Sequence, residues 1–183
     1  APALGWDGGT WPEQARRRVA RLRATCGHRA VRVDHIGSTA VPGLDAKDVI
    51  DIQVTVKSLD VADELTDLLL AAGYPRVADI TEDVAHTDDK TLWQKRFHAS
   101  ADPGRPTNVH LRVDGSPGQQ FALLFQVWLA ANPDERVEYL ALKHDAIAAA
   151  PATSGEYADA KEPWLAGAYR RAWAWADETG WRP

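Results

Sequence analysis

The chain of 183 residues contains no methionine, a single cysteine and no long hydrophobic run. Cys26 alone excludes an internal disulfide and any zinc site built from several cysteines. Apolar runs such as residues 68–72 fall far short of the ~20 residues that a membrane-spanning helix needs, and residues 1–6 lack the pattern of a signal peptide. These absences predict a cytoplasmic protein that does not enter a membrane. Because methionine is missing even at position 1, we expect a piece excised from a longer chain.

Positive charge is also scarce, since 21 Lys and Arg face 26 Asp and Glu, for a net charge of -5. A general nucleic-acid binder is therefore not expected, because neutralising phosphates usually takes a basic surface. One local exception is a cluster of five arginines at positions 16, 17, 18, 21 and 23. Hydrophobic residues at 45% and charged residues at 26% match an ordinary globular protein, which predicts that residues 1–183 fold as one domain.

Hydrophobic periodicity changes along the chain from a mixture of strands and helices to helices alone. Helices are predicted at 11–24, 60–72, 119–131, 134–150 and 156–177, and strands at 30–36, 50–56, 92–99 and 108–113. Residues 73–90 read as a long loop with at most one edge strand, and residues 102–106 as the turn of a hairpin. The expected fold class is α+β, with a mixed sheet and a helical C-terminal third.

The most informative motif is a Gly-Ser turn ahead of a strand with an acidic polar face. Gly37 and Ser38 supply backbone N–H groups and a hydroxyl that can hold a phosphate. Asp51 and Gln53 alternate with apolar residues in the strand that follows, and His110 lies on the polar face of a later strand. We expect these five residues to meet at one end of the sheet.

The runs 35–44 and 47–54 resemble the signature of the GrpB family, small proteins of nucleotidyltransferase fold. Residues 108–113 resemble the family's histidine-containing strand, and the similarity continues through the helices that follow. The resemblance implies a nucleotidyltransferase-like mixed sheet. The chain is similar in particular to the form fused behind dephospho-CoA kinase in actinobacteria, which implies that this kinase domain is a partner within the same chain. One departure is residues 125–130, Phe-Gln-Val-Trp-Leu-Ala, which lack two arginines and an aspartate usual in the family.

Magnesium-dependent transfer normally requires several carboxylates around paired metal ions. Asp51 is one, but Gln53 offers an amide, which is a poorer magnesium ligand. Where a third acid is expected, the sequence provides His110 or Arg112, and magnesium prefers oxygen ligands. The pattern predicts at most weak magnesium binding at Asp51, which is a catalytic residue only if the domain is active.

What remains is a set of donors suited to an anion or a nucleotide. The candidate ligand-binding residues are His35, Gly37, Ser38, Thr39, Lys47, Gln53, Arg96, His110, Arg112, Tyr139, Lys143, Tyr157 and Lys161. Tyrosine and lysine repeat at i, i+4 on two helices, at 139 and 143 and at 157 and 161.

The leading hypothesis, inherited from the resemblance, is a non-catalytic accessory or folding-assistance domain of a dephospho-CoA kinase in coenzyme A biosynthesis. On this hypothesis the full-length protein is the transferase, and the domain binds a nucleotide or phosphate without turnover. Residues 11–24 or 73–90 would contact the kinase domain. The alternatives are an active magnesium-dependent nucleotidyltransferase using an NTP, and a sensor of a nucleotide or CoA-like phosphate.

Overall fold

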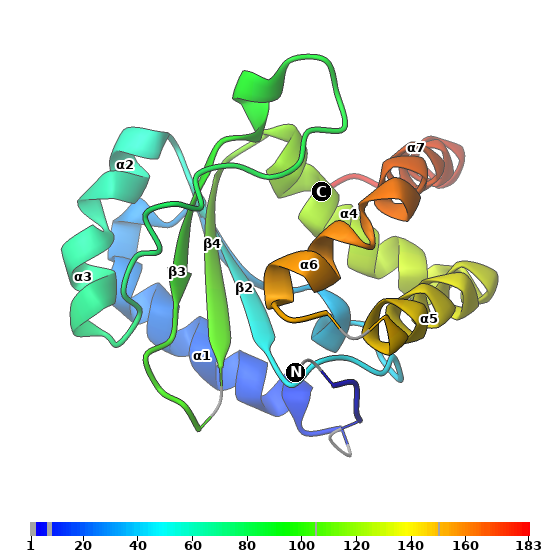
Figure 1. The fold of residues 1–183 in the computed structure, drawn as a ribbon. Helices are drawn as coiled ribbons and strands as arrows, with labels where there is room; N and C mark the ends of the chain where they lie inside the picture. Colours follow the sequence, from blue (N-terminus) through cyan, green and yellow to red (C-terminus); the bar gives the residue numbers. More distant parts are fainter. Residues whose placement is uncertain (1–2, 7–8, 105, 150) are drawn as a thin grey trace.

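The computed structural model describes residues 3–6, 9–104, 106–149 and 151–183 (Figure 1). A four-stranded sheet forms its centre, in the order β1-β2-β4-β3. The strands are β1 (Arg32–Ile36), β2 (Ile50–Val56), β3 (Lys95–Ala99) and β4 (Thr107–Val113). β2 and β4 are parallel, while β1 and β3 pair with them antiparallel. The predicted mixed sheet and the predicted β3–β4 hairpin are therefore confirmed.

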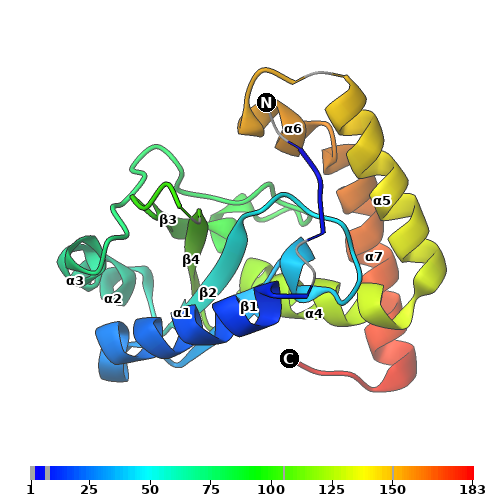
Figure 2. The same cartoon turned by 90° about the horizontal axis from the view of Figure 1, so that it is seen from below.

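Helices lie on both sides of this sheet. They are α1 (Trp11–Cys26), α2 (Leu59–Glu64), α3 (Thr66–Ala71), α4 (Pro117–Ala131), α5 (Pro133–Ala148), α6 (Ser154–Asp159) and α7 (Glu162–Thr179). Figure 2 shows α5, α6 and α7 gathered on the side away from α2 and α3, with the sheet between them. The predicted helical C-terminal third is confirmed.

Two of the predicted helices are each divided in the structure. The segment predicted as 60–72 is interrupted at Leu65, whose N–H donates to the oxygens of Ala62 and Asp63 in tight turns. The segment predicted as 156–177 is broken between α6 and α7, because Pro163 lacks the N–H needed to continue a helix through it. A helix therefore begins afresh at Glu162, which proves important for the site.

The long loop after α3 lies along the outer edge of β3. Val77 N–H donates to the oxygen of Phe97 at 2.9 Å, and Lys95 N–H donates to the oxygen of Thr81 at 2.8 Å. The long loop is therefore confirmed, but it pairs here only through isolated bridges, Arg76 with His98 and Glu82 with Gln94, and its described residues form no edge strand. The strand predicted from residue 92 begins only at Lys95, because residues 90–93 form a short 3₁₀ turn capped by the Asp89 side chain.

Strand alternation divides the core in two. The apolar side chains of β2 and β4 pack against α1, α2 and α3 in one cluster. A second cluster joins α4, α5 and α7 to Val41 and Leu44. The polar side chains of β2 and β4 face α4, which brings them toward the helical third. Within the described ranges, no helix is both long and apolar enough to cross a bilayer.

Candidate functional site

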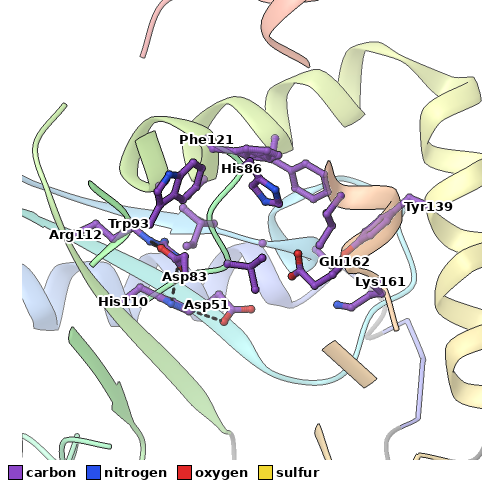
Figure 3. A pocket seen from close by; sticks show the side chains of 18 residues that line it. Asp51, Asp83, His86, Trp93, His110, Arg112, Phe121, Tyr139, Lys161 and Glu162 are labelled. Atoms are coloured by element: carbon purple, nitrogen blue, oxygen red, sulfur yellow. Dashed lines mark hydrogen bonds and ion pairs between the residues drawn. The ribbon is translucent and has the colours of Figure 1, made fainter. Parts of the chain in front are cut away.

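A cavity of about 330 Å³ lies between the polar face of the sheet and the helical third (Figure 3). Its floor comes from the Gly37–Ser38 turn, Asp51 and His110. The loop at residues 83–86 forms one wall, and α4, α5 and the start of α7 form the other. Its volume is at the lower end of the ~300 to 1,000 Å³ range of small-molecule sites. The predicted Gly-Ser turn and acid therefore do meet at a cavity.

Glycine is required at position 37 for two reasons. Its φ of +77° lies in the left-handed region that other residues rarely adopt, and a Cβ here would sit 2.9 Å from Asp51 Oδ2. The turn thus brings its backbone directly against the Asp51 carboxylate. Ser38 follows on the cavity lining, with its hydroxyl 3.5 Å from the hydroxyl of Tyr139.

Asp51 and His110 lie on the same face of the sheet, as predicted. Nε2 of His110 is 3.1 Å from Asp51 Oδ1, and Nδ1 is 3.2 Å from Lys95 Nζ. Burial, together with the charges of Lys95 and Arg112, lowers the pKa of His110 to about 4. The ring is therefore neutral at pH 7, where it accepts a hydrogen bond from Lys95 and donates one to Asp51.

Asp51 remains ionised in this environment. Burial alone would raise its pKa, but hydrogen bonds from His110 and Asn108 and the charge of Lys161 outweigh burial and lower the pKa below its ordinary value. The carboxylate therefore has hydrogen-bond donors and a cation around it, and both favour its charged form.

Asp83, which the sequence did not single out, anchors the loop over the floor. Its Oδ1 is 2.7 Å from Lys95 Nζ, and Arg112 donates to both of its oxygens at 2.8 Å. Burial would raise the pKa of Asp83, but the charges and hydrogen bonds of Arg112 and Lys95 hold it well below its usual range. Arg112 does line the cavity, as predicted, but its charge is already paired with Asp83.

Gln53 shares the polar face but lies beneath the floor, which corrects its predicted place on the cavity. Its side chain is fully buried, donates to the oxygen of Gln119 at 3.2 Å and accepts from Arg112 at 2.9 Å. Because β2 is a central strand covered by α4, the amide is used to hold Arg112 and the helix in place.

Three further candidates do not reach the cavity, which corrects their predicted role there. The register places Ile36 opposite Asp51, so that His35 faces α1 on the other side of the sheet. Its Nε2 lies 2.8 Å from the hydroxyl of Thr39, which is itself buried. Arg96 also points to that side, where it forms an ion pair of 2.7 Å with Asp63 of α2.

Two lysines lie close to the ring of one tyrosine beside the floor. Lys47 Nζ and Lys161 Nζ lie 4.6 and 4.5 Å from the centroid of the Tyr157 ring. Burial lowers the pKa of both, while the charge of Asp51 opposes that shift in each case. Lys161 lines the cavity directly, whereas Lys47 and Tyr157 are not part of its lining, which corrects their predicted place there. The Tyr157 hydroxyl is buried and has no hydrogen-bond partner among the described residues.

The second tyrosine–lysine pair is placed differently. Lys143 Nζ lies 5.2 Å from the centroid of Tyr139 and donates to the backbone oxygen of Asp45 at 2.6 Å. Burial and the nearby charges of Lys161 and Lys47 lower its pKa to about 7. Tyr139 lines the cavity, whereas Lys143 lies outside the lining and packs against the Tyr139 ring.

Aromatic side chains that sequence reasoning did not select form the upper part of the cavity. Phe121 and Phe125 of α4 have centroids 5.5 Å apart, and His86 lies 5.2 Å from Trp93. Glu162, which also lines the cavity, was not selected from the sequence either. These residues lie on a loop and on different helices, so no regular spacing in the sequence relates them. A sequence pattern could therefore not have predicted that they share one cavity.

The donor set does not fit paired magnesium ions. Asp51 is surrounded by His110 and Lys161 rather than by further carboxylates, and Asp83 is paired with two cations. Across the part of the chain that the structure describes, no group of three or more His, Cys, Asp or Glu is placed to hold a metal ion. Metal binding at Asp51 would therefore rely on a single carboxylate.

The departure in α4 lies away from this site. Gln126, Val127 and Ala130 replace the usual charged residues, and none of them lines the cavity. Val127 and Ala130 are exposed on the outer side of the helix. The departure therefore affects a part of α4 that does not contribute to the cavity lining.

Comparison with known proteins gives a consistent assignment. The sequence profile described as GrpB protein matches residues 8–171. Dephospho-CoA kinase of Mycobacterium tuberculosis is 61% identical over 189 residues, covering 95% of this chain but 46% of the relative. A UPF0157 protein of Streptomyces coelicolor is 34% identical over 152 residues, covering 82% of this chain and 73% of the relative. The chain thus spans about half the length of the kinase relatives that it matches.

Solved structures agree on the fold. GrpB from Enterococcus faecalis superposes with a TM-score of 0.75 at 24% identity, covering 94% of this chain and 96% of that one. The Cid1 poly(U) polymerase gives a TM-score of 0.51 at 13% identity, covering 77% of this chain and 42% of that one. The second likeness supports the nucleotidyltransferase-like architecture and nothing beyond the fold. With a family profile that covers most of its length, the chain belongs to the GrpB family.

Proposed function

We propose that this cavity binds a nucleotide or a related phosphate-bearing ligand without turnover. We further propose that residues 1–183 act as one accessory, folding-assistance domain of a dephospho-CoA kinase in coenzyme A biosynthesis. The observation that carries the binding proposal is the excess of lysines around Asp51, next to a Gly-Ser turn that borders the cavity.

The charge balance supports an anionic ligand. Asp83 is neutralised by Lys95 and Arg112, so it adds no net negative charge to the floor. Lys47 and Lys161 are the lysines near Asp51. The charge of Asp51 acts to raise the pKa of both lysines, and the charge of Lys161 acts to lower the pKa of Asp51. With Glu162 included, the four cations Lys47, Lys95, Arg112 and Lys161 face the three carboxylates Asp51, Asp83 and Glu162. This excess of positive charge favours an added anion such as phosphate.

The missing acids support binding without transfer. A two-metal mechanism needs several carboxylates, and the position two residues after Asp51 holds the buried, fully engaged Gln53. His110 is neutral and has partners at both ring nitrogens. Neither side chain can replace an acidic metal ligand without breaking an existing contact.

The kinase role is supported by the relatives. Several proteins named dephospho-CoA kinase contain a region about 61% identical to this chain, which makes up less than half of their length. This chain has no Gly-x-x-x-x-Gly-Lys phosphate loop, so phosphorylation by that mechanism would need another part of the protein. We place the domain in the cytoplasm beside that kinase, with α1 or the 73–90 loop as its contact surface.

Calorimetric titration of the 183-residue chain with ATP tests the binding proposal. Lys161→Gln should weaken ATP binding about tenfold or more, since a charge-assisted hydrogen bond contributes ~1.5 to 3 kcal/mol. Lys57→Gln is the matched control, because Lys57 is exposed at the end of β2, away from the cavity. Equal weakening in both variants, or no binding by the unmodified chain, would contradict the proposal.

The accessory role is tested separately in the full-length protein. We expect the kinase portion to accumulate in soluble, active form when residues 1–183 are present and to be depleted when they are deleted. Supplying the domain as a separate chain should restore part of the soluble kinase. Equal yields and equal specific activities with and without the domain would remove the support for this role.

A further inference from the structure

Glu162 places a carboxylate in the cavity wall. Its Oε2 is buried and makes no hydrogen bond to any described residue. Figure 3 shows the side chain pointing toward the middle of the cavity, near Lys161. Burial and the charges of Asp159 and Asp83 raise its pKa, while the charge of Lys161 opposes the rise. Buried polar groups are nearly always satisfied, so this oxygen calls for an explanation.

A purely structural role does not account for this orientation. Glu162 is the first residue of α7, where a carboxylate stabilises the helix dipole from the solvent side equally well. Here the cavity wall around it includes the apolar side chains of Phe121, Phe125 and Leu165. A carboxylate held among such side chains loses hydration, and that loss is recovered only when a donor binds.

We propose that Glu162 accepts a hydrogen bond from an amino group on the base of the bound nucleotide, so that the site selects amino-substituted bases such as adenine. This inference rests on the proposed function and names its ligand class. The phosphates would lie toward Lys161 and the Gly37–Ser38 turn, and the base would lie against the aromatic wall formed by α4.

The surrounding charge favours a neutral donor over an ammonium ion. Lys161 lines the same cavity, and the charge of Arg112 is already paired with Asp83. A cationic ligand would be repelled by Lys161, whereas the N–H of a neutral amino group would not. Aromatic side chains next to a single acceptor suit a flat heterocycle with one amino group at its edge.

The test compares ATP with purine riboside triphosphate, which differs only by lacking the 6-amino group. We expect the unmodified chain to bind ATP at least tenfold more tightly, because the analogue leaves the carboxylate unpaired. Glu162→Leu should bring the two affinities within about twofold of each other. Glu162→Gln, which keeps an acceptor oxygen, should retain part of the preference. Dephospho-CoA carries the same base and serves as a second probe. Its affinity relative to that of ATP shows whether the site prefers a CoA-like ligand or a free nucleotide.

The outcomes distinguish this inference from the proposal on which it rests. Equal binding of ATP and its analogue by the unmodified chain would overturn the role of Glu162 and leave nucleotide binding intact. A preference for ATP that persists in Glu162→Leu would overturn it as well. Failure of every nucleotide to bind would instead overturn the proposed function. Because the first comparison uses no variant, it stands even if Glu162→Leu fails to fold.

Discussion

Replacing Asp83 with asparagine should strongly destabilise the protein, because it removes the one anion from a buried cluster of two cations. Lys95 and Arg112 each have side chains 9% exposed, and that of Asp83 is 17% exposed. Asparagine keeps the size of the side chain but not its charge. Three charge-assisted contacts of 2.7 to 2.8 Å would be lost or weakened at once.

The expected loss is about 3 kcal/mol at pH 7, since breaking one partner from a buried ion pair costs ~3 to 5 kcal/mol. We take the lower end because Arg112 keeps its contact with Gln53. For a domain of this size, that loss lowers the melting temperature by roughly 6 to 12 °C. The depressed pKa of Asp83 means that its contribution is fully present above about pH 4 and is lost as the pH falls further.

Urea unfolding followed by circular dichroism measures this directly. Asp79→Asn is the matched control, because Asp79 is an exposed residue of the same loop. The double variant Asp83→Asn/Lys95→Met should lose less than the sum of the single variants, since the two side chains are in contact. A loss below 1 kcal/mol in Asp83→Asn, or a loss no larger than in the control, would refute the buried-cluster reasoning.

Three further predictions concern the floor of the cavity. Gly37→Ala should lose more stability in urea than Gly43→Ala, because both sites have positive φ but only the first would place a Cβ against Asp51; similar losses would contradict the close contact. The free energy of unfolding should fall between about pH 6.5 and 4, because His110, with its pKa lowered to about 4, resists protonation when folded. The slope of that fall should be shallower in His110→Gln, and an unchanged slope would exclude this cause. Tyr157→Phe should keep or slightly raise the melting temperature, because it removes a buried hydroxyl that has no partner among the described residues, and a fall of several degrees would indicate a missed contact.

Strand alternation predicted the central strands and part of the site. Ile50 to Val56 read correctly as a strand with Asp51 on its polar face, and the same rule placed His110 beside it. The same rule did not place His35 correctly. The face on which His35 lies depends on the register of β1 against β2, and that register is set by pairing across the sheet and not by the sequence of β1 alone.

Strand alternation could not predict the residues that reach the site from distant parts of the chain. Asp83 reaches the floor because its loop follows the edge of β3, and Glu162 faces the cavity because Pro163 forces a new helix to begin there. Strand alternation predicted that the Gln53 side chain would reach the cavity, but α4 covers it, and Gln53 donates a hydrogen bond to the backbone oxygen of Gln119. Each of these depends on tertiary packing, which local periodicity does not encode.

The most direct test of the account is ATP titration of the 183-residue chain in EDTA and in Mg²⁺, with pyrophosphate measured in parallel. We predict similar affinity in both buffers and no pyrophosphate release. Asp51→Asn should bind ATP as well or better, because it removes a negative charge close to Lys47 and Lys161. Binding that requires Mg²⁺, is lost in Asp51→Asn and is accompanied by pyrophosphate release would contradict the account and establish an active nucleotidyltransferase.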